Sequence, residues 1–224
     1  MNEASVIAWD GPTRVFKWAL VFVVVDGWIS NTYGASLPLW HKCNGYAALV
    51  LIVFRLLWGL VGGSTARFAS FYVGPLGVLT YLRAVPKYLG HNPLGGWMVV
   101  ALLVLVGVMA TTGLFAADED RLIIDGPLAK TISDSAVEFA ARWHRHIFTA
   151  IEAFVAVHIT ANVIYALSHR EPLIEAMITG RKPAGDYADA SEAVPGSWGK
   201  AAACLVVAAA MVFGPIFALG GRPF

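Results

Sequence analysis

Long apolar segments separated by short polar connections dominate the hydrophobic pattern of this 224-residue chain. Each segment is long enough to cross a membrane as a helix at ~1.5 Å per residue, with some tilt. None alternates as a strand would, and a lipid-exposed sheet edge is excluded in a bilayer. The pattern therefore predicts an all-α integral membrane protein whose spans cover residues 15–30, 40–61, 96–117, 145–167 and 201–219.

Composition agrees with this prediction, because 58% of the residues are hydrophobic, only 14% are charged and the mean hydropathy is +0.65. A soluble domain of this size cannot bury so much apolar surface. A net charge of +1 without a basic, aromatic-rich run gives no indication of nucleic-acid binding, so we expect no nucleic-acid partner. Cys43 and Cys204 fit no spacing for a disulfide framework, a c-type haem or zinc. The N-terminus lacks a basic leader region, so we expect no cleaved signal peptide.

Basic residues in the loops between the spans indicate how the spans are oriented in the membrane. Most Lys and Arg residues outside the spans fall on the side that carries the N-terminus, which places that side in the cytoplasm. On the same side, residues 67–89 mix apolar and basic side chains and are interrupted by glycine and proline. This composition favours an amphipathic segment lying on the membrane lipid, with an ordinary loop as the alternative.

Histidines at regular depths are the most informative polar groups inside the spans. His144 and His158 are fourteen residues apart, so on a helix they lie within about 40° of each other and about 21 Å apart along the axis. His41 begins the second span at the depth of His144. Two imidazoles at one depth on two helices can hold one haem iron from both sides. His158 alone could instead hydrogen-bond a neighbouring helix.

Charged groups inside the spans are costly and usually face a cavity or a partner. Lys17 in the first span and Arg55 in the second lie at the depth expected for His158. The Arg55 guanidinium could bind haem propionates through bidentate pairs, or it could reach the inner interface as a snorkelling side chain. Asp26 could take part in quinol proton transfer, although a simple polar contact is the better interpretation.

Several sequence motifs recur in order along the chain and point to one family. They are WDGPTRVFKW (9–18), WHKCNGY (40–46), FRLLWG (54–59), RF (67–68), GP (74–75), YLGHNPLGGWM (88–98), TGLF (112–115), the pair His144 and His158, and AMITGRK (176–182). With these motifs the chain resembles the bacterial b-type cytochromes that include the cytochrome subunit of nickel–iron hydrogenases.

The resemblance implies a fold and a function. It implies a four-helix transmembrane cytochrome b domain over residues 9–183 in the bacterial inner membrane. The linker and fifth transmembrane helix expected over residues 184–224 are an addition to the four helices of the family. The resemblance also implies two stacked b haems that pass electrons between quinone and a periplasmic partner, either a c-type cytochrome or an oxidoreductase subunit. The fifth helix could pack on the bundle, form a homodimer interface or remain peripheral.

Site residues follow from the same resemblance. His41 and His144 match the outer haem ligands of the family, and His158 matches one inner ligand. Arg55 is joined by Arg14 and His91 as expected cofactor-binding residues, and quinone is expected to dock by the loop that begins at His91.

Lys17 is a departure, because the family carries a histidine there as the second inner ligand. Burial beside a metal favours a neutral amine, so Lys17 could ligate the inner iron, and this is the outcome we favour. The inner haem could instead be five-coordinate, with an open site for a sensor or small-ligand oxidoreductase role, or it could be absent. A colourless membrane anchor or transporter is the non-redox alternative.

Overall fold

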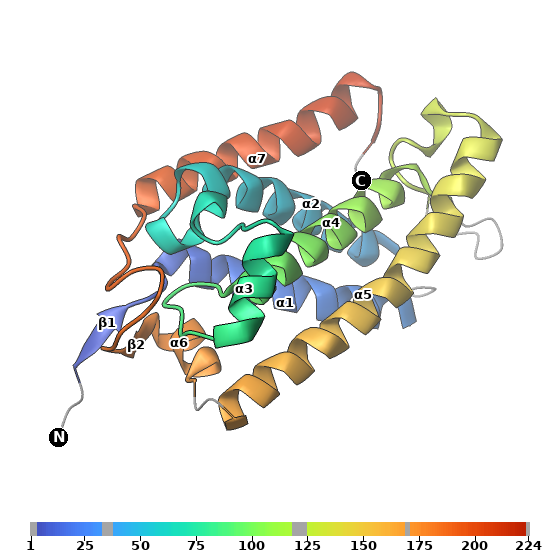
Figure 1. Ribbon diagram of the computed structural model, residues 1–224. Helices are drawn as coiled ribbons and strands as arrows, with labels where there is room; N and C mark the ends of the chain where they lie inside the picture. The colour runs from blue at the N-terminus through green and yellow to red at the C-terminus, as the bar shows by residue number, and fades with distance from the viewer. Residues whose placement is uncertain (1–3, 33–37, 118–124, 169–170, 223–224) are drawn as a thin grey trace. The chain divides into compact units, whose positions relative to one another are not determined.

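The computed structural model describes residues 4–32, 38–117, 125–168 and 171–222, which are mainly helical (Figure 1). The long helices are α1 (Gly11–Thr32), α2 (Pro38–Val61), α4 (Pro93–Phe115), α5 (Asp134–Ser168) and α7 (Trp198–Ala218). The shorter elements are β1 (Ser5–Ile7), η2 (Ser64–Ala66), η3 (Phe68–Ser70), α3 (Pro75–Ala84), η5 (Ala129–Thr131), α6 (Leu173–Thr179) and β2 (Arg181–Pro183).

Four helices within the described residues, α2, α4, α5 and α7, are long and apolar enough to cross a membrane. The helix α1 has comparable length, but Lys17 and Asp26 interrupt its apolar sequence. The predicted helical class is confirmed, and these helices agree with a chain of several membrane spans. The helix α7 forms where the fifth span is predicted, and its crossing of the membrane beside a four-helix bundle stays a prediction.

Helix α5 begins earlier than its apolar sequence predicts. The predicted span starts at residue 145, whereas the helix starts at Asp134. The carbonyl of Ser133 accepts the first turn's N–H groups, and an acidic residue such as Asp134 is favourable at a helix N-terminus. Alanines and other good helix formers fill the added turns. His144 therefore lies in the interior of α5 and not at its beginning.

The segment between α2 and α4 contains the short amphipathic helix α3. Pro75 occupies its first turn, where the missing N–H costs no hydrogen bond, and Val85 ends it in a left-handed conformation with φ of 43°. Leu76 is 79% exposed, whereas Tyr81 on the other face is buried. This sidedness agrees with the predicted surface-lying segment.

Residue contacts divide the chain into two compact units, and each long helix contributes to both. Unit 1 consists of Met1–Lys17, Arg55–Ala101 and Phe154–Cys204, and unit 2 consists of Trp18–Phe54, Leu102–Ala153 and Leu205–Phe224. The predicted domain boundary at residue 183 is a separate matter and stays a prediction.

Unit 1 is held together around the start of α1. The strands β1 and β2 pair antiparallel, with Val6 opposite Lys182. The Asp10 carboxylate caps α1 by accepting the N–H of Thr13 at 2.8 Å, and its other oxygen accepts the N–H groups of Gly63 at 3.2 Å and Gly196 at 3.0 Å. One buried carboxylate thus joins three segments that are far apart in the sequence.

Unit 2 is joined by polar and aromatic contacts between its helix segments. The Asn44 amide donates to the carbonyl of Val23 at 2.9 Å, which links α2 to α1. Tyr46 of α2 and Phe213 of α7 have ring centres 5.5 Å apart.

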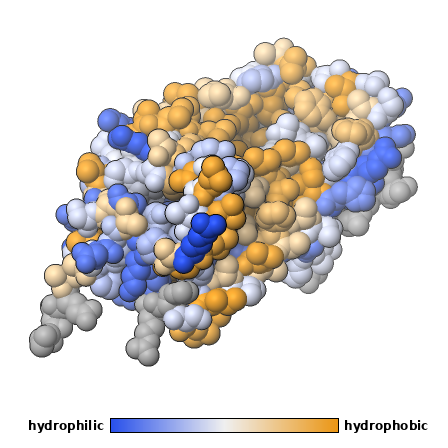
Figure 2. Space-filling view, viewed as in Figure 1, coloured by the Kyte–Doolittle hydropathy of each residue, from blue (hydrophilic) through white to orange (hydrophobic). Residues whose placement is uncertain are grey.

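Large apolar side chains remain exposed on all five long helices, and Figure 2 shows a largely hydrophobic visible face. Such a surface is suited to lipid.

Replacing Asp10 by alanine will destabilise the protein, because three backbone N–H groups lose their acceptor. We expect a loss on the order of 3 kcal/mol in unfolding free energy, measured by titrating the purified protein in mixed micelles with a denaturing detergent. Asp186 is exposed, so Asp186→Ala is the matched control and should stay within about 0.5 kcal/mol of the unaltered protein. Equal stability of the two variants would contradict the capping role.

Candidate functional site

His41 of α2 and His144 of α5 lie next to each other in unit 2. Their ring centres are 6.1 Å apart and the rings are inclined at 85°. An imidazole–metal bond is about 2 Å long, so two rings that share one metal ion have centres roughly 6 Å apart. The observed spacing therefore matches the one expected for two rings that share one metal ion.

Hydrogen bonds select which nitrogen of each ring is available. His144 Nδ1 donates to the carbonyl of Met109 at 2.8 Å, which leaves Nε2 with its lone pair. His41 Nδ1 is 2.9 Å from the hydroxyl of Ser30, and that hydroxyl donates its own proton to the carbonyl of Gly27. The hydroxyl oxygen then accepts the Nδ1 proton of His41. Metal-binding histidines are typically held in this way, with the ring nitrogen that does not bind the metal donating to an oxygen.

Gly113 of α4 makes room for the His144 ring. A Cβ atom at this glycine would stand 3.0 Å from His144 Cε1 and 3.3 Å from Nδ1. Both distances are shorter than an ordinary van der Waals contact, so any side chain here would displace the ring. Together with the ring spacing and the available Nε2 atoms, this close approach fits a haem iron bound between His41 and His144.

Asp26 makes a polar contact with a residue next to His41. Trp40 Nε1 donates to the two carboxylate oxygens of Asp26 at 2.9 and 2.8 Å. The pair joins α1 to α2 within unit 2. This is the simple polar contact that the sequence favours for Asp26.

Arg55 is the most unusual polar group of unit 1. Its side chain is only 2% exposed, and both of its Nη atoms lack a hydrogen-bond partner among the described residues. Its guanidinium carbon is 4.7 Å from the ring centre of Phe68 and 5.9 Å from that of Phe71. A buried cation without a counter-ion is costly, so the site is suited to an anionic ligand such as a haem propionate.

Arg14 and His91 contribute two more unpartnered atoms to unit 1. Arg14 Nη1 donates to the carbonyl of Ile178 at 2.5 Å, whereas its Nε has no partner in the part of the chain that the structure describes. The same holds for Nδ1 of His91, whose ring lies 4.7 Å from the rings of both Trp9 and Phe71. A carboxylate-bearing cofactor would give these buried atoms the hydrogen-bond partners that they lack among the described residues.

His91 lies in a basic environment. Burial lowers the pKa of His91 well below its usual value, and the nearby charges of Lys17, Arg55, Lys182 and His158 lower this pKa further. His91 is therefore neutral. Lys17, Arg55 and His158, which sequence reasoning assigns to the inner site, all belong to unit 1 and all act electrostatically on His91.

His158 and Lys17 have close neighbours of their own. The Asn162 amide nitrogen is 3.2 Å from His158 Nε2 and donates to the His158 carbonyl at 2.7 Å. Lys17 Nζ stands 3.3 Å from the ring centre of Trp9. Sequence reasoning did not identify Trp9 as a neighbour of Lys17, although Trp9 is the first residue of the first motif.

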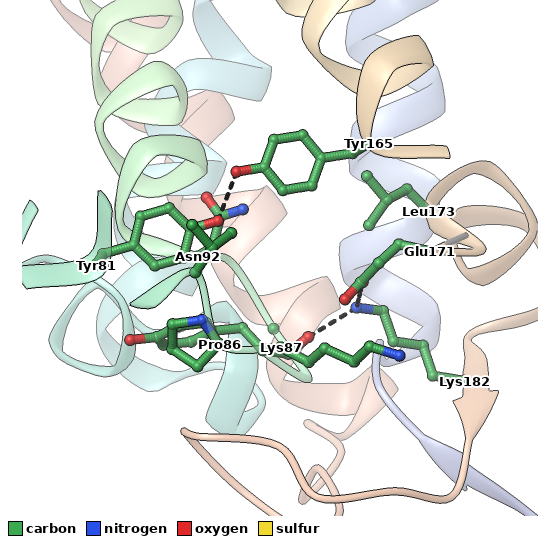
Figure 3. A pocket seen from close by; sticks show the side chains of 11 residues that line it. Tyr81, Pro86, Lys87, Asn92, Tyr165, Glu171, Leu173 and Lys182 are labelled. Carbon is green, nitrogen blue, oxygen red and sulfur yellow. Dashed lines mark hydrogen bonds and ion pairs between the residues drawn. The ribbon is translucent and has the colours of Figure 1, made fainter. Parts of the chain in front are cut away.

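A small cavity of about 80 Å³ lies in unit 1 beside the loop that precedes α4 (Figure 3). The hydroxyls of Tyr81 from α3 and Tyr165 from α5 are 2.5 Å apart at its wall. Lys182 Nζ donates to Glu171 at 3.1 Å and to the carbonyl of Tyr88 at 2.8 Å. Burial and the contact with Tyr165 raise the pKa of Tyr81, so this phenol keeps its proton. No motif in the sequence marks either tyrosine.

Comparisons with known proteins show the family of the chain. The family model described as prokaryotic cytochrome b561 matches residues 8–180. Three relatives are named probable Ni/Fe-hydrogenase B-type cytochrome subunit. They come from Bradyrhizobium diazoefficiens (25% identity over 218 residues, 81% of this chain and 87% of the relative), Rhizobium leguminosarum bv. viciae (24% over 224 residues, 84% and 93%) and Azotobacter vinelandii (25% over 219 residues, 80% and 89%). The comparison with solved structures gives no match. The resemblance stated from the motifs is confirmed.

Gly113→Val tests whether the glycine keeps the His144 ring in place. The added side chain will displace the ring and lower the haem content per polypeptide, measured by the pyridine haemochrome assay. Gly45 on α2 has open space around its Cα atom, so Gly45→Val is the matched control and should leave the haem content unchanged. An equal effect of both substitutions would show that the close approach is unimportant.

Proposed function

Because this chain belongs to the prokaryotic cytochrome b561 family, we propose that it passes electrons between the quinone pool and a periplasmic redox partner, with haem b bound in each of its two units. The family consists of membrane-bound b-type cytochromes, and the relatives are named as hydrogenase subunits. The partner is accordingly an oxidoreductase subunit such as a hydrogenase, or a c-type cytochrome. The membrane is the bacterial inner membrane, with the N-terminus in the cytoplasm as the Lys and Arg distribution favours.

The spacing of His41 and His144 carries this proposal. Haem b supplies an iron that gains and loses one electron, and bis-histidine binding suits electron transfer because it leaves no open position. In unit 2 the two Nε2 atoms would hold the iron, while Met109 and Ser30 keep the rings oriented.

Unit 1 would hold the second haem. His158 would bind the iron, and the Arg55 guanidinium, with Arg14 and His91, would hold the propionates that satisfy their open atoms. A single helix, α5, supplies His144 to one unit and His158 to the other. Their fourteen-residue spacing supports haems at two depths of the membrane.

The cavity of unit 1 supports a quinone site beside the His91 loop. Quinone carbonyl oxygens accept hydrogen bonds, and the Tyr81 and Tyr165 hydroxyls and the Lys182 ammonium are donors. Tyr81 remains protonated because its pKa is raised. Asp189 accepts the N–H groups of Leu89 and Gly90, so it holds the loop that forms the cavity wall.

A second function has one observation in its favour. The Lys17 amine lies over the Trp9 ring at 3.3 Å, and an amine retained there would leave the iron at His158 with an open position. Such a site would bind small ligands, as in a sensor or a small-ligand oxidoreductase. Carbon monoxide binding to the reduced protein separates this function from electron transfer with full ligation.

Haem content tests the proposal directly. We expect the purified protein to contain two b haems per chain, and His41→Ala or His144→Ala to lower this to about one, because the remaining imidazole cannot hold the iron from both sides. His146 lies on another face of α5, so His146→Ala is the control and should retain two. Colourless protein would establish a non-redox role, and unchanged haem content in both histidine variants would refute the assignment of unit 2.

Replacing Tyr81 by phenylalanine tests the quinone site, since it removes one donor and keeps the ring. Reduction of the haems by a short-chain quinol should slow about 10-fold in stopped-flow absorbance, as the loss of a buried hydrogen bond to a ligand predicts. Haem content should stay unchanged. Tyr72 is exposed and does not line the cavity, so Tyr72→Phe is the control. Equal rates in the two variants would place the quinone elsewhere.

A further inference from the structure

The part of unit 1 that contains α3 is basic and has no acidic residue of its own. Residues 27–117 contain no Asp or Glu, whereas Arg83 lies near the end of α3 and Lys87 follows just beyond it. Both basic side chains are exposed, and neither forms an ion pair with a described residue. Asp189 contacts the chain after Lys87, but its two oxygens accept backbone N–H groups there. The two cations are therefore available to an anion from outside the chain.

The outer face of α3 combines leucines with one of these cations. Leu76, Leu79 and Leu82 are 79%, 54% and 52% exposed. At about 100° per residue, Arg83 lies within roughly 40° of both Leu76 and Leu79 around the helix. Tyr81, on the other side, is buried. The helix thus rests on the protein through one face and leaves apolar side chains and a guanidinium together on the other.

Two aromatic side chains connect the start of α3 to the start of α4. The ring centres of Tyr72 and Trp97 are 5.4 Å apart, and Trp97 Nε1 donates to the carbonyl of Val73 at 3.0 Å. Both rings are partly exposed, and such side chains are typical of the boundary between membrane and water. Trp97 lies near the start of α4, which is long and apolar enough to cross a membrane. This contact would hold α3 at the level of the lipid headgroups.

We propose that the outer face of α3, together with Lys87, binds an anionic phospholipid of the adjacent leaflet. Arg83 and Lys87 pair with the phosphate, and the exposed leucines lie against the acyl chains. Long basic side chains can reach headgroups from an apolar face, and cations near a membrane surface attract anionic lipid. A soluble anion would leave the leucines uncovered, whereas a phospholipid matches both parts of the surface. The inference does not depend on haem or quinone.

Lipid binding to the purified full chain tests the proposal. In native mass spectrometry, phosphatidylglycerol should bind more tightly than phosphatidylcholine with the same acyl chains. Joint Arg83→Gln and Lys87→Gln substitution should weaken binding of the first phosphatidylglycerol about 10-fold, as the loss of two cations near one headgroup predicts, and should leave phosphatidylcholine binding unchanged. Arg83→Lys keeps the charge and should retain the binding.

A second double variant is the matched control. Lys130 and Arg142 are exposed basic residues of unit 2, so Lys130→Gln with Arg142→Gln removes the same charge elsewhere and should leave phosphatidylglycerol binding unchanged. Equal losses in the two double variants would show a general attraction to positive charge and overturn the inference. Circular dichroism should show the same helix content and thermal unfolding in all variants, so that a loss of binding reports on the surface and not on folding.

Photo-crosslinking locates the bound lipid. Phosphatidylglycerol with a photoactivatable group near its headgroup should label peptides from residues 72–87, and the Arg83→Gln, Lys87→Gln variant should lose this labelling. Labelling confined to α5 or α7 would overturn the assignment to α3. Glycerophosphoglycerol has the same headgroup without acyl chains and should not compete. Full competition at equal concentration would indicate a site for soluble anions and overturn the assignment to a lipid.

Discussion

Inside a membrane protein every buried polar group needs a partner within the molecule, and this constraint organises both candidate sites. In unit 2 the Nδ1 atoms of His41 and His144 have oxygen partners, so only the Nε2 atoms remain for a metal. In unit 1 the open atoms belong to Arg14, Arg55 and His91. The satisfied groups fix the orientation of the rings, and the open ones are the atoms that the proposed cofactor would satisfy.

Charge balance explains why unit 1 is suited to an anionic cofactor. Three of its carboxylates are used within the fold: Asp10 and Asp189 accept backbone N–H groups, and Glu171 pairs with Lys182. Arg55 is left with aromatic rings around it, which stabilise a cation less than a carboxylate does. Propionates would supply the missing negative charge.

Much of the fold could be read from the hydrophobic pattern, and much of the site from spacing. The apolar segments predict the long helices, and equal depth on two spans predicts the meeting of His41 with His144. Helix α5 begins eleven residues before the predicted span, because the added turns carry charged residues such as Glu138 and Arg142 among their apolar ones and their helical structure depends on the end formed by Ser133 and Asp134. Tyr81, Tyr165 and Trp9 could not be predicted as site residues, since aromatic side chains at helical spacing are ordinary in membrane proteins.

The sequence by itself determined the class of protein, the family and the identity of the histidines, because these depend on local periodicity and on motifs. Only the tertiary structure decided which nitrogen of each ring is available, that the Arg55 Nη atoms have no hydrogen-bond partner among the described residues and that Lys17 lies on Trp9. These properties depend on partners such as Met109, Phe68 and Gly180, which are distant in the sequence. Hydrogen bonding and burial are set by such neighbours, so no reading of one segment could reveal them.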